Sequence, residues 1–335
     1  MFCRHFFLIV YLIPVISLAQ IKWINVDSMY QPLPKPVHVF YTDQPIDTGA
    51  FRAFYVIADL DNKKLDFTTD TTYKRRLTPN QFYYKNQLPL VVVNGTFFSF
   101  ETNKNLNVVV KDGKLVSHNR FAYRGKGKDS VNRYYAFRAA VGINKKRVAD
   151  VVWTYTGYDS CCGTKYVSGY QWPLIPTNLT QSHVDGIPLS FSTRFDSVLT
   201  KPAAPFKNGR SSIWKVQTAI GGGPVLVQQG RVVITNEEEN MFPGKAISDK
   251  HPRTAMGYTK DNKLIILVIQ GRSESSGGAT LIQEAQILRD LGCVEALNLD
   301  GGGSSCLLIN GKETIKPSDK EGQRAVPAVF IIRKK

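Results

Sequence analysis

The stretch that decides the fold is "TLIQEAQILRDLGCVEALNLDGGGSSCLLI", which runs from Thr280 to Ile309. Its first part predicts a helix, because Thr280 can cap the N-terminus, Gln283 completes a capping box and Gly292 supplies the stop. Helical periodicity places four apolar side chains on one face, namely Leu281, Ala285, Leu288 and Leu291. We therefore expect this face to pack on the rest of the protein.

Glu284 is the exception on this apolar face. Its carboxylate falls within the arc that the helix buries. An unpaired charge in a protein core costs too much free energy to persist. The position of Glu284 therefore predicts either a buried ion pair or a side chain that points into a cavity.

A strand follows the helix, and a glycine-rich turn follows the strand. Alternation in "VEALNLD" predicts that one side of the strand carries Val294, Ala296, Asn298 and Asp300. The turn that follows consists of Gly301, Gly302, Gly303, Ser304 and Ser305. The next apolar run, "CLLI", has the pattern of another strand. This order predicts an α+β or mixed α/β fold with its functional edge at the strand ends.

The rest of the chain is rich in patterns of antiparallel strands. The pairs Asp112–Gly113 and Asn310–Gly311 are strong hairpin signals between strand-like flanks. The runs Leu88–Asn94 and Leu264–Gln270 lack alternation, which indicates central strands covered on both faces. Residues 100–215 have the composition of a long ordered loop or an insertion. We predict a strand-rich central sheet with hairpins and a few packed helices.

The N-terminal segment predicts export. Arg4 precedes an apolar run from Phe6 to Leu18, and small residues end this run at Ala19. We expect cleavage after Ala19 and a periplasmic or extracellular mature chain without a membrane span, although an uncleaved anchor is the alternative. The predicted organisation is a signal peptide at residues 1–19, an N-terminal elaboration packed on the main domain at 20–87, and the main domain at 88–335.

The chain is basic, with 43 Lys and Arg against 27 Asp and Glu, a formal net charge of +16 and a pI of about 9.6. This charge favours anionic partners such as phosphorylated glycans or lipid headgroups, or it belongs to a solvated surface without such a partner. Nucleic acid is disfavoured, because no long basic run or nucleic-acid-binding motif is present.

The cysteines that follow the predicted cleavage site define neither a disulfide pattern nor a metal site. They show no repeated metal-ligand spacing, so we expect no metal and no other cofactor. Their number permits several disulfide connectivities, and we predict no particular pairing among Cys161, Cys162, Cys293 and Cys306.

The two glycine-rich segments do not match nucleotide-binding loops. A phosphate loop needs Gly-Lys-Ser/Thr before a helix, whereas Ser305 is followed by Cys306 and a strand pattern. A dinucleotide fingerprint opens a helix, whereas Gly223 is followed by Pro224. Glycines alone are compatible both with a tight turn and with a ligand site.

Polar residues at strand ends favour a site. Asn94, Gln270 and Asp300 each follow an apolar strand pattern and precede glycine. A sheet presents a ligand site in this way. Arg253 and Arg272 lie in such segments, and for each of them a surface salt bridge or a clamp on backbone carbonyls is the alternative to a ligand contact.

Taken in order, these segments resemble the phosphodiester glycosidase family over about residues 88 to 333, and the last two motifs are the most specific. "NGTFF" differs mildly from the family pattern at Gly95 and Thr96. The motifs that carry the resemblance are "NGTFF" (Asn94–Phe98), "GGGPVLV" (Gly221–Val227), "HPRTAMG" (His251–Gly257), "QGR" (Gln270–Arg272) and "NLDGGGSS" (Asn298–Ser305).

The resemblance implies hydrolysis of a sugar-1-phosphodiester at the bond between the anomeric carbon and the phosphate oxygen. Arginines would bind the phosphate, and a carboxylate would assist an oxocarbenium-like sugar. The candidate catalytic residues are Asp300 and Glu284, and the alternative for Glu284 is to pair with an arginine and hold it. The candidate substrate-binding residues are Asn94, Gly95, His251, Arg253, Arg272, Asn298, Gly301, Gly302, Gly303, Ser304 and Ser305.

The expected substrate is of the GlcNAc-1-phospho-sugar type. Two other functions use the same residues. One is a non-catalytic module of the cell surface that binds phosphorylated glycans. The other is a phosphodiesterase that cleaves a phosphorus–oxygen bond, although no clustered Asp/His pattern supports its metal-dependent form.

Overall fold

The computed structural model describes residues 21–120, 123–124, 133–134, 138–158, 165–170 and 211–335. The predicted signal peptide at residues 1–19 lies outside the described residues, as do Cys161 and Cys162. Among the described residues, Cys293 and Cys306 are buried free thiols.

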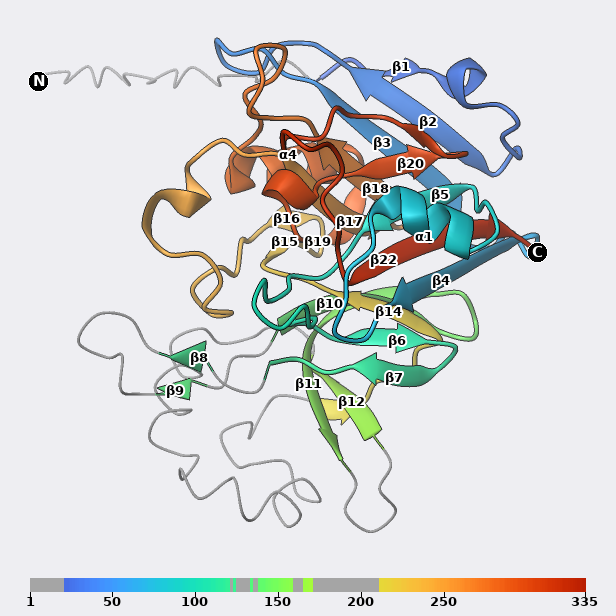
Figure 1. Ribbon diagram of the computed structural model, residues 1–335, viewed down its shortest axis with the longest axis vertical. Coiled ribbons are helices and arrows are strands. Elements are labelled where there is room, and N and C mark those ends of the chain that lie inside the picture. Colours follow the sequence, from blue (N-terminus) through green and yellow to red (C-terminus); the bar gives the residue numbers. More distant parts are fainter. Residues whose placement is uncertain (1–20, 121–122, 125–132, 135–137, 159–164, 171–210) are drawn as a thin grey trace, which may run out of the picture.

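Three large antiparallel sheets build the structure (Figure 1). The first has eight strands and contains both N-terminal and C-terminal segments. In spatial order its strands are β1 (Ile24–Asn25), β2 (Val37–Thr42), β3 (Ala53–Asp59), β18 (Lys263–Ile269), β17 (Arg253–Thr259), β19 (Cys293–Asn298), β15 (Val225–Gln228) and β16 (Arg231–Val232).

The other two sheets have seven and five strands. The seven-stranded sheet contains β13 (Ser211–Ile213), β12 (Lys165–Tyr170), β11 (Ala149–Tyr158), β10 (Arg138–Ile143), β14 (Thr218–Gly221), β6 (Val109–Lys111) and β7 (Lys114–Ser117). The five-stranded sheet contains β21 (Lys312–Glu313), β20 (Leu307–Ile309), β5 (Val91–Asn94), β22 (Ala328–Lys334) and β4 (Leu65–Thr71). A separate two-stranded ribbon pairs β8 (Tyr123–Arg124) with β9 (Arg133–Tyr134).

The two α-helices of the described chain cover outer faces of these sheets. α4 (Leu281–Asp290) begins at Thr280 with the predicted capping box to Gln283. Its apolar face packs on the eight-stranded sheet. α1 (Pro79–Lys85) begins at a second capping box and inserts Phe82 against the five-stranded sheet. Short 3-10 helices are η1 (Asp27–Tyr30), η5 (Gly244–Ile247) and η6 (Gly302–Ser304).

The main core lies between the three sheets, and β18 shows how the strand pattern builds it. Alternate side chains of this strand, Leu264, Ile266 and Val268, belong to the core shared by all three sheets. The intervening ones, Ile265, Leu267 and Ile269, belong to the core beneath α4. Both faces of β18 are therefore covered, which explains the unbroken apolar run.

Most local predictions are confirmed. Asp112–Gly113 joins β6 to β7, and Asn310–Gly311 joins β20 to β21. β5 and β18 lie inside their sheets, as their lack of alternation predicted. Strand pairs are all antiparallel in the described chain, and only two α-helices accompany them, so the fold is mixed but mostly β.

The prediction for residues 100–215 is wrong in part. Described residues of this range supply six strands of the seven-stranded sheet, β6, β7, β10, β11, β12 and β13, and both strands of the ribbon formed by β8 and β9. The pairs β6–β7, β10–β11 and β11–β12 join strands that follow one another in the sequence, whereas β14 pairs with β6 and β10 over long stretches of sequence, so no local pattern defines the whole sheet. Strands from residues 20–87 pair with strands of the C-terminal segments in the other two sheets, and the predicted domain boundary at residue 87 stays a prediction.

Candidate functional site

Four chain segments meet at one corner of the eight- and five-stranded sheets. Backbone hydrogen bonds join the end of β5 to the segment after β19, because Asp300 N–H donates to the Gly95 carbonyl at 3.0 Å. The Asn94 side-chain amide donates to the Asp300 carbonyl at 2.5 Å. The segment before β17 joins through Gly302 N–H, which donates to the Pro252 carbonyl at 2.9 Å. The loop after β18 completes the corner with Arg272, whose guanidinium lies near Gly302.

Asp300 carries a strongly perturbed carboxyl group at this corner. Its Oδ2 atom is buried and has no hydrogen-bond partner. Burial raises the pKa of Asp300 to about 7, against the opposing effects of the Ser304 hydroxyl, the Arg324 charge and the Gly301 N–H. A carboxyl group that titrates near neutral pH is typical of catalytic acids and bases.

The turn after Asp300 is compact and bonded mainly to itself. Gly302 has a φ of +63°, in the left-handed region that glycine adopts without strain. Ser304 N–H donates to the Gly301 carbonyl and Ser305 N–H to the Gly302 carbonyl. The turn can therefore offer few backbone donors to a ligand, because these two N–H groups and that of Gly302 already form hydrogen bonds within the protein.

Buried hydrogen bonds fix the base of the turn. Asn94 Oδ1 accepts from the Thr254 hydroxyl and from Cys306 N–H, each at 3.0 Å. The Thr254 hydroxyl also lies 3.1 Å from Ser305 Oγ. These side chains are almost fully buried. The structure therefore buries Asn94 and the last turn residue, Ser305, on the protein side of the turn, and the Asn94 amide also holds the Asp300 carbonyl.

A cationic group lies beside the turn. The Arg272 guanidinium is 3.3 Å from the position that a Cβ atom on Gly302 would occupy. Arg272 is exposed, and no carboxylate among the described residues forms an ion pair with it. Its Nη2 atom lies 3.5 Å from Nδ1 of His251. Burial and the charges of Arg253 and Arg272 lower the pKa of His251, which favours a neutral imidazole at pH 7.

Arg253 lies deeper than Arg272. Its Nε atom donates to the Ala279 carbonyl at 2.9 Å, and its Nη2 atom donates to the Asp249 carbonyl at 3.1 Å. Arg253 is only 4% exposed, and burial lowers its pKa. Arg253 therefore binds backbone carbonyl groups, which the sequence analysis gave as the alternative to a ligand contact. Its charge lies beneath that of the exposed Arg272.

Glu284 occupies the core side of α4. Its side chain is fully buried, and both carboxyl oxygens lack a hydrogen-bond partner. Burial raises the pKa of Glu284 to about 8, against an opposing effect of the Arg253 charge. Glu284 is therefore mainly protonated at neutral pH, and it is electrostatically coupled to Arg253.

Asn298 faces the "GGGPVLV" segment. Its Nδ2 atom donates to the Gly223 carbonyl at 2.9 Å, and Gly223 N–H donates to the Asn298 carbonyl at 2.7 Å. The Asn298 Oδ1 atom is buried without a partner. This reciprocal pair explains why two distant motifs of the sequence meet.

Sequence reasoning missed two charged residues of this corner, Asp319 and Arg324. They form a bidentate ion pair, with Nε–Oδ2 at 2.7 Å and Nη2–Oδ1 at 2.9 Å. A Cβ atom on Gly303 would overlap both side chains. The short spacing of opposite charges was the available signal, but surface pairs of this kind are common and rarely indicate a site.

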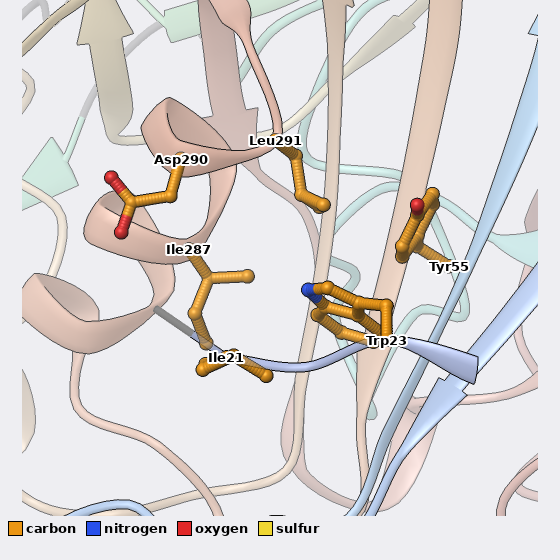
Figure 2. Close-up of a pocket in the computed structure, with 6 residues that line it drawn as sticks. All are labelled: Ile21, Trp23, Tyr55, Ile287, Asp290 and Leu291. Carbon is orange, nitrogen blue, oxygen red and sulfur yellow. The ribbon is translucent and has the colours of Figure 1, made fainter. Parts of the chain in front are cut away.

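A pocket in the described part of the chain lies away from the candidate site (Figure 2). It has a volume of about 280 Å³ and contains none of the predicted site residues. It is formed by the C-terminal end of α4 and the segment before β1, and is lined by Ile21, Trp23, Tyr55, Ile287, Asp290 and Leu291. The candidate site is thus defined by its polar groups.

No group of three or more His, Cys, Asp or Glu side chains in the described parts of the chain is arranged to hold a metal ion. Within the same residues, no helix is long and apolar enough to cross a membrane.

Comparisons with known proteins point in one direction. Residues 178–333 match the family model described as phosphodiester glycosidase. The chain is 41% identical over 82 residues to the SPbeta prophage-derived uncharacterized protein YomE of Bacillus subtilis, covering 24% of this chain and 13% of that protein. It is 30% identical over 120 residues to the mouse N-acetylglucosamine-1-phosphodiester alpha-N-acetylglucosaminidase, covering 35% of this chain and 22% of the mouse protein. The aligned stretches therefore span less than a quarter of either relative.

Solved structures support the same fold. A hypothetical protein from Synechocystis matches with a TM-score of 0.63 at 15% identity, over 94% of this chain and 64% of that one. The catalytic domain of the zebrafish N-acetylglucosamine-1-phosphodiester alpha-N-acetylglucosaminidase matches with a TM-score of 0.57 at 21% identity, over 94% and 89% of the two chains.

The residues that match the family model include four of the five sequence motifs. The fifth motif, "NGTFF" at Asn94–Phe98, lies before the first matched residue.

Proposed function

We propose that this chain, whose residues 178–333 match the phosphodiester glycosidase family model, hydrolyses the glycosidic bond of a sugar-1-phosphodiester. The observation that carries the proposal is the exposed, unpaired Arg272 beside Gly302, in the turn that begins at the perturbed Asp300. A cationic side chain and a titratable carboxyl group thus both lie next to the Gly301–Ser305 turn. We further propose that the sugar is N-acetylglucosamine, which appears in the names of the mouse and zebrafish relatives, and that the protein acts after export.

The cationic group suits the phosphate. A phosphodiester carries one negative charge, and its negative charge increases when the bond to the sugar breaks and a phosphate monoester leaves. Arg272 is exposed and forms no ion pair with a carboxylate of the described residues, so its guanidinium can bind two phosphate oxygens, and Arg253 adds positive charge from below. Neutral His251 can accept a hydrogen bond from Arg272 and thereby orient it. In this proposal the substrate-binding role of Arg253 is electrostatic, because its clamp on the carbonyls is retained.

Asp300 suits the sugar. In its ionised form it stabilises the positive charge that develops at the anomeric carbon, and it either attacks that carbon or removes a proton from the attacking water. The bond between the anomeric carbon and the phosphate oxygen breaks, and the phosphate takes the electron pair. Phosphate is a good leaving group, so no second carboxyl group has to protonate it. We assign no chemical step to Glu284, because its buried carboxyl group is mainly protonated at neutral pH and forms no ion pair with a described arginine. The configuration of the sugar product distinguishes the two roles of Asp300.

A single hydrolysis experiment in ¹⁸O-labelled water tests the proposed function. Purified protein is incubated with GlcNAc-1-phospho-mannose, with and without a chelator, and the products are analysed by mass spectrometry. We expect free GlcNAc and a mannose phosphate whose phosphate group contains no ¹⁸O, because the carbon–oxygen bond breaks. Label in the phosphate, or release of GlcNAc-1-phosphate, would instead identify a phosphodiesterase. Saturable binding without turnover would identify a glycan-binding module.

Substitution of Arg272 tests the phosphate site. Arg272→Gln is expected to lower kcat/KM by about 10- to 100-fold, because a hydrogen bond to a charged group contributes about 1.5–3 kcal/mol. Steady-state kinetics on the same substrate measure the effect. Arg231→Gln, at an exposed position of β16, is the matched control and should leave kcat/KM unchanged. Equal values for the two variants would remove Arg272 from the site.

A further inference from the structure

The Asp319–Arg324 pair lies against the turn that carries Asp300. Both side chains are about one-quarter exposed, at 26% and 24%, and they are joined by two hydrogen bonds. The Arg324 guanidinium also lies 5.4 Å from the centre of the Phe100 ring. A cation held both by a bidentate carboxylate and over an aromatic ring has little freedom to move.

Gly303 brings the turn into contact with this ion pair. A Cβ atom at this position would overlap Nη2 of Arg324 and Oδ1 of Asp319. Any side chain here would push the turn away from the pair or would break the pair. The glycine therefore allows the backbone of the turn to approach a fixed positive charge.

We propose that Arg324, held by Asp319 and Phe100, is a positioning residue that fixes the Gly301–Ser305 turn and favours the ionised carboxyl group of Asp300. The catalytic consequence rests on the proposed function, whereas the effect on the carboxyl group follows from the packing alone. A positive charge at this place offsets part of the cost of ionising a buried carboxyl group.

Among the groups around Asp300, Arg324 is the one whose charge should affect the pKa of Asp300. The turn itself contributes the Ser304 hydroxyl and the Gly301 N–H, and Arg324 contributes the charged side chain that lowers the pKa of Asp300 among the described residues. β5 reaches Asp300 through the Asn94 amide and the Gly95 carbonyl, both of which contact its backbone. Removal of the Arg324 charge should therefore raise the pKa of Asp300 above about 7.

The experiment compares the titration of Asp300 in four proteins by ¹³C NMR of its carboxyl carbon, with Asp300→Asn to assign the signal. We expect the midpoint of Arg324→Gln to lie about one pH unit above that of the wild type, since loss of an opposite charge shifts such values by this order. Arg324→Lys should stay nearer to the wild type because it keeps the charge. Arg289→Gln removes an arginine whose Nε and Nη2 atoms both donate to Oδ1 of Asp290 on α4, and should leave the midpoint unchanged.

Kinetics separate this proposal from the proposed function. If the wild type hydrolyses the substrate, the rising limb of its pH profile should move upward in Arg324→Gln by the same amount, with kcat at pH 7 lower by roughly 5- to 10-fold and KM changed by less. If the wild type is inactive, the proposed function fails, while the NMR titration still tests Arg324. An unshifted or lowered midpoint in Arg324→Gln, at a thermal stability equal to that of Arg289→Gln, would overturn the proposal. Should Arg324→Gln not fold, Arg324→Met removes the same charge while keeping most of the length of the side chain, and an unchanged midpoint there would count against the proposal equally.

Discussion

Asp300→Asn is expected to lower kcat by about three orders of magnitude, because an amide can neither attack the anomeric carbon nor remove a proton from water. The fold should survive, since the hydrogen bonds from Asp300 to β5 use its backbone N–H and carbonyl groups. The measurement is single-turnover and steady-state hydrolysis of GlcNAc-1-phospho-mannose. Asp290→Asn, an exposed aspartate on α4, serves as the matched control and should keep wild-type turnover. Wild-type turnover in Asp300→Asn would remove Asp300 from the mechanism.

The raised pKa of Asp300 also predicts how the stability of the Asp300→Asn variant compares with that of the wild type. Burial raises this pKa from 3.8 to about 7, so the folded state holds the proton more tightly than the unfolded state. The stability that this proton provides is fully present below about pH 4 and is lost as the pH rises through about 7. Asp300→Asn should therefore unfold at no lower a temperature than the wild type at pH 8. In the active wild type, kcat/KM should rise with pH through a midpoint near 7, because the ionised form acts.

How far a sequence predicts this fold depends on the range of the interactions. The helix from Leu281 to Asp290 was predictable, since capping and apolar periodicity are local. The same holds for the hairpin at Asn310–Gly311. The assignment of strands to three sheets was not predictable, because it depends on pairs such as β4 with β22, whose residues are more than two hundred positions apart.

The candidate site was likewise predictable from the sequence only in part. Its motifs were visible because unusual polar residues follow apolar strands, and the structure brings Asp300, Arg272 and the glycine turn to one corner. Which atoms are free to meet a ligand was not visible. Asn94 and Ser305 are buried and bonded beneath the turn, and Arg253 is clamped on carbonyls. Such contacts come from side chains of other segments, which no local pattern encodes.

Glu284 is expected to make the protein less stable as the pH rises from about 5 to 8. Its pKa lies at about 8 in the folded protein and near 4.5 in the unfolded chain, so the folded state binds the proton more tightly. The stabilisation is fully present below pH 4.5 and is lost as the pH rises through about 8. Its size is a few kcal/mol at most, since one pKa unit corresponds to about 1.4 kcal/mol and Arg253 already offsets part of the burial cost.

Glu284→Gln removes this titration while it keeps the shape of the side chain. Urea unfolding at pH 5, 6, 7 and 8 should show a flatter dependence of the unfolding free energy on pH than in the wild type. Glu237→Gln, an exposed glutamate, should retain the wild-type slope. Turnover at pH 7 in Glu284→Gln should remain within about tenfold of the wild type, because the native carboxyl group is mainly protonated there and takes no part in the chemical step. Loss of turnover as large as that of Asp300→Asn would instead place Glu284 among the catalytic residues, and an unchanged pH slope would show that its carboxyl group is not buried as a neutral acid.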